Sequence, residues 1–357
     1  MLAPTAPRPL SILSPGKDFF FFFGSTFVVL LVWLAATVFH VDSFFVLAAV
    51  AVVANGPHLV STWTRVYFDK REWKERPFSI VGVPLLIAAT VTTLAAFYGH
   101  LGSRILNSTI LYWATWHFVA QNWGLLRIYQ RKSGESLDGL ALRLEKPILF
   151  ATVAFALTHR IYTGPRVLFG TEVFTPPMPA AVPYAILAPL GLMTAALVAL
   201  RLRDRHAPHA KGAWVRLGFL ACSALGFIVP FLFIKTDDTS AFAAAACWHG
   251  VQYLGIVRHY HRTTWKDGVN ENSRLISWLS QPGKLRAGLY IALLLALAGS
   301  GYVLIGLGSF LTRGTAWDAY RWGAVVWISF TLSHYWLDGV IWKLRRPEVA
   351  ARVGISV

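Results

Sequence analysis

Apolar stretches of about 20 residues recur along the whole chain, and each is long enough to cross the ~30 Å hydrocarbon layer of a bilayer as a helix. They leave no room for a separate soluble domain. Hydrophobic residues make up 55% of the 357 residues, charged residues make up 14%, and the mean hydropathy is +0.52, which exceeds what the core of a soluble domain requires. The sequence therefore predicts an all-α, polytopic bundle of transmembrane helices that forms a single integral membrane domain over residues 1–357.

Ten segments have the length and apolarity expected of membrane spans. Their expected ranges are 19–39, 43–64, 78–99, 106–127, 146–162, 182–200, 213–234, 239–258, 287–311 and 322–343. An even number of spans places the two termini on the same side of the membrane. The basic loops between the segments then decide which side that is.

The distribution of positive charge predicts the orientation. With both termini in the cytoplasm, six of the 33 Lys and Arg residues fall on the outer side, which leaves 27 on the inner side. Loops rich in Lys and Arg remain in the cytoplasm, so this asymmetry favours ten spans with the N-terminus and C-terminus inside, in a membrane that we expect to be the bacterial inner membrane. The net charge of +16 is then a topology signal, and we expect no nucleic-acid partner.

Four of the 11 histidines lie well inside predicted spans. Each precedes a Lys or Arg at the predicted cytoplasmic boundary by seven to ten residues, which places it about 10–15 Å inside that boundary. All four are on even-numbered spans, which run in the same direction. Polar groups at this depth cost several kcal/mol unless they are paired, so the common level predicts one shared site. These histidines are His58, His117, His249 and His334.

A polar residue follows each of these histidines by about one helical turn, on the same helix face. Imidazoles at one level are the usual ligands of iron, copper or zinc, and amide, hydroxyl or carboxylate partners orient their rings. We therefore predict a metal held by the four histidines, with the polar residues as candidate catalytic or orienting groups. They are Ser61 or Thr62, Gln121, Gln252 with Tyr253, and Asp338.

An Arg-x-Tyr unit follows two of the histidines at the predicted cytoplasmic boundary. Arg127 and Arg258 begin these units and are candidates for contact with a cofactor, although Arg and Tyr also anchor helix ends at lipid headgroups. His259 comes directly after Arg258 and is a further candidate metal ligand, with lipid headgroup contact as the alternative. Because residues two apart cannot face one centre from a regular helix, at most one of His259 and His261 can join the site, and His259, at the helix end, is the better candidate.

Three short motifs resemble those of a known family. They are Gly56-Pro57-His58, Trp116-His117-Phe118 with Gln121, and Trp248-His249-x-x-Gln252-Tyr253, in this order along the chain. They resemble motifs of the Brp/Blh membrane carotenoid dioxygenases, in which a Pro-His motif, a His-Phe motif and a late His-x-x-x-His pair hold iron. The motifs cover well under a tenth of the chain.

The resemblance implies that His58, His117 and His249 are iron ligands. It departs at Tyr253, which stands where the pair has its second histidine. His334 or His259 would have to supply that ligand instead. The chain also has additional predicted helices at its C-terminal end.

The function that these features predict is that of an iron-dependent membrane oxidoreductase, which binds a lipophilic substrate or lipid in the cytoplasmic half of the bilayer and draws on a separate electron-donor protein. Non-haem iron is preferred because a dry, apolar slot suits oxygen activation better than hydrolysis; another transition metal remains an alternative. Two other interpretations stay open. One is a haem-binding electron carrier with two axial histidines, and the other is a transporter or channel with a histidine and Asp338 relay for protons or ions.

Overall fold

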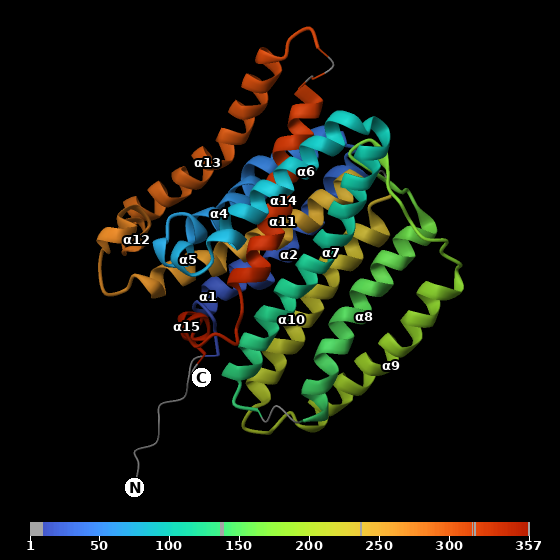
Figure 1. The fold of residues 1–357 in the computed structure, drawn as a ribbon. Helices are drawn as coiled ribbons and strands as arrows, with labels where there is room; N and C mark the ends of the chain where they lie inside the picture. Colours follow the sequence, from blue (N-terminus) through green and yellow to red (C-terminus); the bar gives the residue numbers. More distant parts are fainter. Residues whose placement is uncertain (1–9, 136–138, 236–237, 316, 318, 356–357) are drawn as a thin grey trace.

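The structure is a computed structural model that describes residues 10–355 apart from 136–138, 236–237, 316 and 318, and it is almost entirely helical. The α-helices are α1 (Pro15–Asp18), α2 (Ser25–Trp33), α3 (Ser43–Val50), α4 (Gly56–Val66), α5 (Lys70–Glu75), α6 (Val83–Phe97), α7 (Gly99–Lys132), α8 (Leu140–Thr163), α9 (Ala181–Arg203), α10 (Ala210–Ile228), α11 (Asp238–Thr264), α12 (Arg274–Ser280), α13 (Lys284–Leu311), α14 (Ala319–Ile341) and α15 (Pro347–Arg352). The long helices run side by side as a bundle, which confirms the all-α prediction (Figure 1).

Short irregular elements complete the fold. Wide π-helical turns occur within or at the ends of long helices, and a 3₁₀ turn precedes α12. These are η1 (Phe19–Phe23), η2 (Leu34–Val38), η3 (Ala51–Asn55), η4 (Phe78–Gly82), η5 (Val229–Phe233) and the 3₁₀ turn η6 (Glu271–Ser273). Between α8 and α9, strands β1 (Val167–Leu168) and β2 (Thr171–Glu172) form a two-stranded antiparallel hairpin in which Leu168 pairs with Thr171.

Each of the ten segments predicted to span the membrane is helical over nearly its whole length. Six helical segments of the described chain are long and apolar enough to cross a bilayer, and they indicate an integral membrane protein. They are Pro15–Val38, Ser43–Val66, Phe78–Phe97, Ala181–Arg203, Ala210–Phe233 and Lys284–Leu311. The other four predicted spans correspond to α7, α8, α11 and α14, which carry more polar residues.

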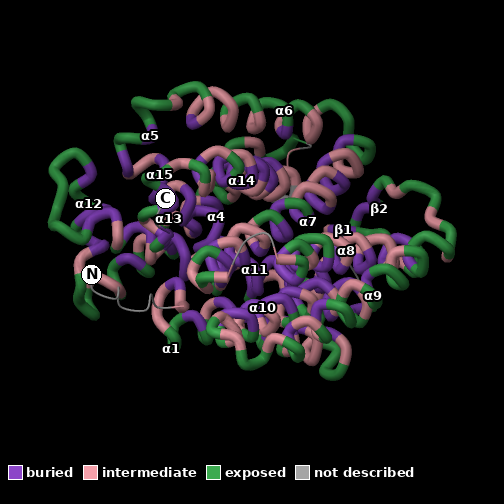
Figure 2. The backbone as a smooth tube through the Cα atoms, turned by 90° about the horizontal axis from the view of Figure 1, so that it is seen from below, coloured by how far each residue is buried: buried purple, intermediate pink, exposed green. Residues whose placement is uncertain are grey.

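The helices form a buried centre and an apolar outer layer. Seen along the bundle, α4 and α11 lie near the middle, whereas α6 and α9 lie at the periphery and have few buried residues (Figure 2). Leu86, Leu192 and Val303 are examples of large apolar side chains on that outer layer that project away from the protein. An exposed apolar layer of this kind is suited to lipid and unsuited to water.

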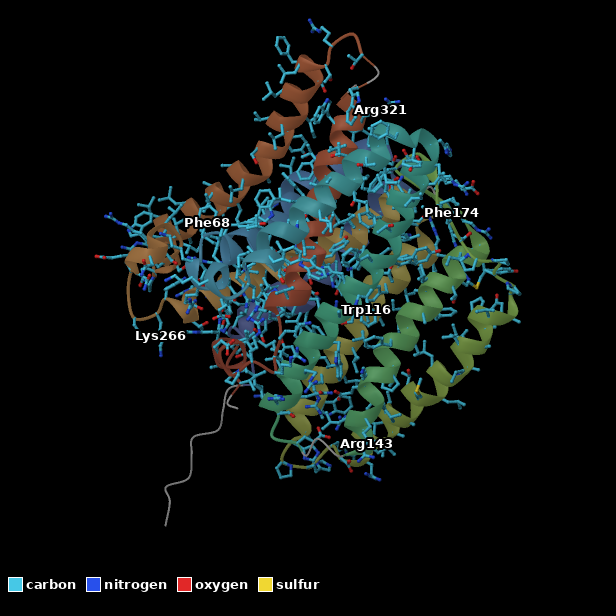
Figure 3. The ribbon with its side chains drawn as sticks, viewed as in Figure 1. Phe68, Trp116, Arg143, Phe174, Lys266 and Arg321 are labelled. Atoms are coloured by element: carbon cyan, nitrogen blue, oxygen red, sulfur yellow. The ribbon has the colours of Figure 1, made fainter. Side chains whose placement is uncertain are left out.

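The labelled charged side chains lie toward the two ends of the bundle. Arg143 and Lys266 lie toward the end of the bundle where α7, α11 and α14 finish, and Arg321 lies toward the opposite end, whereas Trp116 is about halfway between (Figure 3). We call the first of these the basic end. Every helix that carries one of the four predicted ligands finishes at the basic end, so these helices are parallel to one another.

A buried ionic cluster joins four helices at the basic end. Glu145 of α8 accepts hydrogen bonds from Gln130 of α7 at 2.9 Å, from Arg201 of α9 at 2.9 Å and from Arg216 of α10 at 3.0 Å. Glu135, after α7, pairs with the same two arginines. Burial raises the pKa of Glu135, but the two guanidinium groups outweigh it and leave the pKa below its usual value. Two carboxylates therefore balance two arginines within the bundle.

Candidate metal centre

Four parallel helices each place one histidine at the centre of the bundle. His58 lies on α4, His117 on α7, His249 on α11 and His334 on α14. Their exposed fractions are between 0% and 7%. One ligand nitrogen of each lies within 4.8 Å of those of the other three. The structure thus brings together the four histidines that the sequence predicted to share a site.

The four rings form a closed circuit. Ring centroids are 4.7 Å apart for His58 and His249, 4.8 Å for His249 and His117, 4.8 Å for His117 and His334, and 4.3 Å for His334 and His58. The Nε2 atoms of His117 and His334 are 3.1 Å apart. Two adjacent imidazole ligands at about 2.1 Å from one metal ion, at right angles, would be about 3.0 Å apart. The spacing therefore fits neighbouring positions in one coordination shell.

The local sequence explains how His58 reaches this point. Pro57 has no N–H and its ring crowds the preceding turn of a regular helix. The π-helical turn η3 ends at Asn55, two residues before it, and widens the helix where the proline requires room. Across from His58, α11 has Gly250, at which an added Cβ would lie 3.2 Å from the Cβ of His58. A glycine at this position allows α4 and α11 to approach closely enough for their histidines to meet.

The polar atoms of two of these rings have no partner among the described residues. Both nitrogens of His58 and both nitrogens of His249 are buried without a hydrogen bond. A buried polar group without a partner costs about 1–3 kcal/mol, and two whole imidazoles in this state are unusual. A metal ion coordinated by one nitrogen of each ring would satisfy them, and imidazole nitrogens are suitable donors for it.

His334 is oriented by a hydrogen-bond network on its other side. Thr62 Oγ1 lies 2.7 Å from His334 Nδ1 and donates to Asp338 Oδ1 at 3.0 Å. The tautomer of His334 that carries its proton on Nδ1 donates it to Thr62 and matches the hydrogen bond from Thr62 to Asp338. That tautomer leaves a lone pair on Nε2, directed toward the centre. Tyr253 also donates to Asp338 Oδ1, at 2.5 Å, and Trp342 Nε1 donates to the Tyr253 hydroxyl at 3.1 Å.

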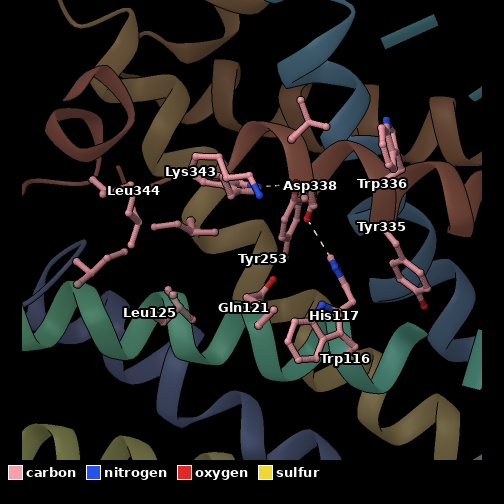
Figure 4. Close-up of a pocket in the computed structure, with 18 of the residues that line it drawn as sticks. Trp116, His117, Gln121, Leu125, Tyr253, Tyr335, Trp336, Asp338, Lys343 and Leu344 are labelled. Carbon is pink, nitrogen blue, oxygen red and sulfur yellow. Dashed lines mark hydrogen bonds and ion pairs between the residues drawn. The ribbon is translucent and has the colours of Figure 1, made fainter. Parts of the chain in front are cut away.

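Asp338 is the carboxyl group nearest to the histidines in this network. Its Oδ2 lies 3.8 Å from His117 Nε2, and the two side chains point toward one another across the cavity in Figure 4. Thr62 and Tyr253 hold its other oxygen. This arrangement suits a group that orients ligands and exchanges protons, because the carboxyl contacts two of the histidine rings from outside their circuit.

The two predicted glutamines support the helix backbone near His249. Gln121 donates from Nε2 to the backbone oxygen of His249 and to Gln252 Oε1, both at 3.2 Å. Gln252 in turn donates to Asn122 Oδ1 at 3.4 Å, and this oxygen also accepts from Ser223 at 3.0 Å. The amides thus link α7, α10 and α11 at the level of the histidines. Sequence reasoning missed Asn122 and Gly250, because neither type is a metal ligand and neither stands in a distinctive motif.

The structure does not bring the predicted boundary residues to the four histidines. The guanidinium carbon of Arg258 lies 4.6 Å from the ring of Tyr290, and that of Arg127 lies 5.8 Å from the ring of Trp123. His259 is ten residues beyond His249 on the same helix, about 15 Å along its axis, and is outside the cluster. His334 is the fourth member of the circuit, while Tyr253 packs beside it with 5.3 Å between ring centroids.

A cavity of about 670 Å³ lies beside His117. Aromatic side chains line it near the histidines, and His117, Gln121, Tyr253 and Asp338 supply its polar groups there (Figure 4). Trp116 lines the same cavity and is 59% exposed on the outside of α7. The cavity therefore reaches the lateral surface of the bundle at the depth of the histidines.

Comparisons of the chain with protein-family models, with curated proteins and with solved structures find no match.

Replacing any one of the four histidines by alanine should lower the metal content of the purified protein by at least half, because the remaining ligands cannot close the shell. His206→Ala and His209→Ala are matched controls, because both histidines lie in the loop between α9 and α10, away from the cluster. Metal content is measured by elemental mass spectrometry on protein purified in detergent. Equal content in all six variants would exclude the four-histidine site.

Proposed function

We propose that the chain is a non-haem iron oxidoreductase that takes a lipophilic substrate from the cytoplasmic half of the bilayer. The observation that carries this proposal is the buried circuit of four histidines beside a cavity that reaches the lateral surface of the bundle. A site of this kind combines a ligand set for a redox metal with an entrance from lipid. A separate electron-donor protein is part of the proposal.

The side chains around the cavity have separable roles in this proposal. Bound iron would supply activation of dioxygen. Trp113, Trp116 and Tyr335 line the apolar wall that excludes water from the reacting part of the substrate. Asp338, hydrogen-bonded to Thr62 and Tyr253, holds or releases a proton at Oδ2 next to His117. The Tyr253 hydroxyl donates a hydrogen bond to the other oxygen of that carboxyl group, Oδ1.

The arrangement of the rings favours non-haem iron over haem. Two axial histidines of a haem lie on opposite faces of a flat macrocycle, which must extend on all sides between them. In this circuit His58 lies opposite His117, and His249 lies opposite His334. Between the two rings of either opposite pair, where the macrocycle would lie, are the other two histidines, whose ring centroids are no more than 4.8 Å from those of the pair. A porphyrin would collide with those two rings.

Iron can be tested on the protein itself. The full-length chain purified in detergent should contain about one iron per chain, show no Soret absorption, and bind nitric oxide at its ferrous centre to give an electron paramagnetic resonance signal from a high-spin adduct, because four imidazoles leave open positions on iron. His117→Ala should abolish that signal, and His206→Ala should retain it. A Soret band, or protein without metal, contradicts the proposal.

The role of Asp338 can be separated from a structural one by the isosteric change Asp338→Asn. The amide keeps the size of the side chain but is a poor base, so we expect metal content within about twofold of wild type and a large loss of oxygen consumption with a reducing agent. Thr62→Val, which removes the hydroxyl that links Asp338 to His334, is the matched variant and should lower metal retention instead. Unchanged oxygen consumption in Asp338→Asn would contradict the role of Asp338 in proton exchange. Ion flux coupled to pH in metal-free protein would favour a transporter.

We also propose ten membrane spans in one domain, with both termini and the basic end in the cytoplasm of a bacterium. Support comes from the helical state of all ten segments and from the charge asymmetry of their loops. Under this proposal α7, α8, α11 and α14 cross the membrane together with the six more apolar segments.

Reporter fusions test this topology. Fusions after Arg76, Arg131, Arg205 and Lys343 should all report the cytoplasm, because these residues lie in the basic loops. Fusions after Phe174 and Arg313 should report the opposite side and serve as controls. A cytoplasmic signal from either control, or an external signal from any of the first four, is incompatible with ten spans in this orientation.

A further inference from the structure

The cavity beside His117 has different chemistry at its two ends. Near the histidines its wall is aromatic, whereas toward the basic end it is lined by Lys343, Arg345 and Arg346, directly after the end of α14. Among the described residues that line it, Asp338 carries the only carboxyl group. Asp338 is at the histidine level, so the basic end of the cavity has three cationic side chains and no acidic one.

The cavity follows one face of α7 for four helical turns. The α7 residues along it recur at spacings of three and four, which is the period of a single helix face. They are Trp113, Trp116, His117, Ala120, Gln121, Gly124, Leu125 and Ile128. From first to last the rise is about 22 Å, with His117 about one turn from the far end. A ligand that fills this slot is therefore elongated, and one end of it lies beside the histidines.

The three cations that line the cavity, Lys343, Arg345 and Arg346, have no acidic partner within the described chain. Arg346 donates a hydrogen bond from Nη2 to the backbone oxygen of Val340 at 3.0 Å. This acceptor is neutral, so it does not balance the positive charge of Arg346. Lys343 and Arg345 form no ion pair with any described carboxylate. Charged donors of this kind form strong hydrogen bonds with carboxylate or phosphate groups. An anionic group on the ligand would satisfy them.

We propose that the substrate of this site is a single-chain amphiphile with an anionic head, a long-chain carboxylate, whose head contacts Lys343, Arg345 and Arg346 and whose chain runs along α7 to His117. This inference rests on the proposed function for the identity of the molecule as a substrate. A volume of about 670 Å³ is in the range that holds one drug-sized molecule, which favours a single chain over a two-chain phospholipid with the same kind of anionic head.

The exposed side of the cavity accounts for the entry of such a molecule. Trp116 and Ala120 are exposed on α7, so an alkyl chain can move sideways from the bilayer into the slot while its head remains at the headgroup level. A neutral hydrocarbon would gain nothing from the three cations, and a cationic amphiphile would be repelled by them. The two ends thus set both the charge and the direction of the ligand.

The test is a binding measurement on the full-length protein as purified in a neutral detergent, with tritiated palmitate as the probe. Unlabelled palmitate should displace the probe at a concentration at least about tenfold lower than hexadecanol, which has the same chain without the charge. Hexadecyltrimethylammonium should be weaker still. Phosphatidylglycerol, with an anionic head and two chains, should displace the probe poorly.

Two sets of substitutions locate the effect. The triple variant Lys343→Gln, Arg345→Gln, Arg346→Gln should bind palmitate at least about tenfold more weakly and lose its preference over hexadecanol. The triple variant Lys74→Gln, Lys266→Gln, Lys284→Gln removes the same charge from exposed positions that do not line the cavity, and should bind palmitate within about twofold of wild type.

A third variant tests the slot without altering charge. An added Cβ at Gly124 meets no atom within 4 Å, so Gly124→Trp places an indole in the cavity without a backbone clash, and it should weaken palmitate and hexadecanol alike. Equal affinity for palmitate and hexadecanol in the wild type, or full palmitate binding in the first triple variant, overturns the proposal. Displacement by phosphatidylglycerol as effective as by palmitate overturns the single-chain assignment.

The readout is independent of the proposed function. Palmitate binding is measured without turnover, and it is repeated in His334→Ala, whose side chain does not line the cavity. Charge-selective binding by His334→Ala is expected if the slot recognises its ligand without the metal. Charge-selective binding by wild-type protein that contains no iron would support the ligand class and contradict the oxidoreductase. Iron-containing protein without charge selectivity would do the reverse.

Discussion

Four imidazoles buried together in an apolar bundle impose the constraint on which the rest of the structure depends. No water is available in hydrocarbon to satisfy polar side chains, so each nitrogen needs a partner within the protein or a bound cation. His334 obtains one through Thr62, whereas His58 and His249 obtain none from the described residues. The helices must also approach closely, and Gly250 opposite His58 permits this. The placement of the four histidines therefore depends on the close packing of the helices that carry them.

The same constraint explains how polarity is divided among the helices. Three of the four histidines are on α7, α11 and α14, which also carry the amides Gln121 and Gln252, the Tyr253 hydroxyl and the Asp338 carboxyl group. These three helices are not among the six most apolar helical segments. Outer helices such as α6 and α9 are strongly apolar and have few buried residues. Apolar helices can insulate a polar interior only if they lie outside it, and Figure 2 shows the buried residues gathered toward the centre and the exposed ones on the outer helices.

Helix geometry allowed the sequence to predict the convergence of the four histidines, because a fixed rise per residue converts a position before a basic boundary into a depth. It did not predict the partners. Gln121 and Gln252 follow their histidines by one turn, as the face rule requires, yet they hydrogen-bond to the backbone of α11 and to Asn122. Spacing along a helix gives the face of a side chain, but only tertiary packing decides what lies opposite. For Thr62, the neighbours are Tyr253, His334 and Asp338, from two other helices.

Charge balance connects the histidines to the basic end of the bundle. Arg65 is fully buried, with its guanidinium carbon 3.8 Å from the ring of Tyr260 and 3.9 Å from the ring of Trp342, and its Nε and Nη1 have no hydrogen-bond partner among the described residues. Aromatic faces attract a desolvated cation, and the rings of Tyr260 and Trp342 hold Arg65 in this way. Trp342 links Arg65 to Asp338, because its Nε1 donates to Tyr253, which donates to Asp338. The hydrogen bonds from Trp342 to Tyr253 and from Tyr253 to Asp338 therefore connect the four histidines to the ring that faces Arg65, and Trp342 also lines the cavity through which a ligand would enter.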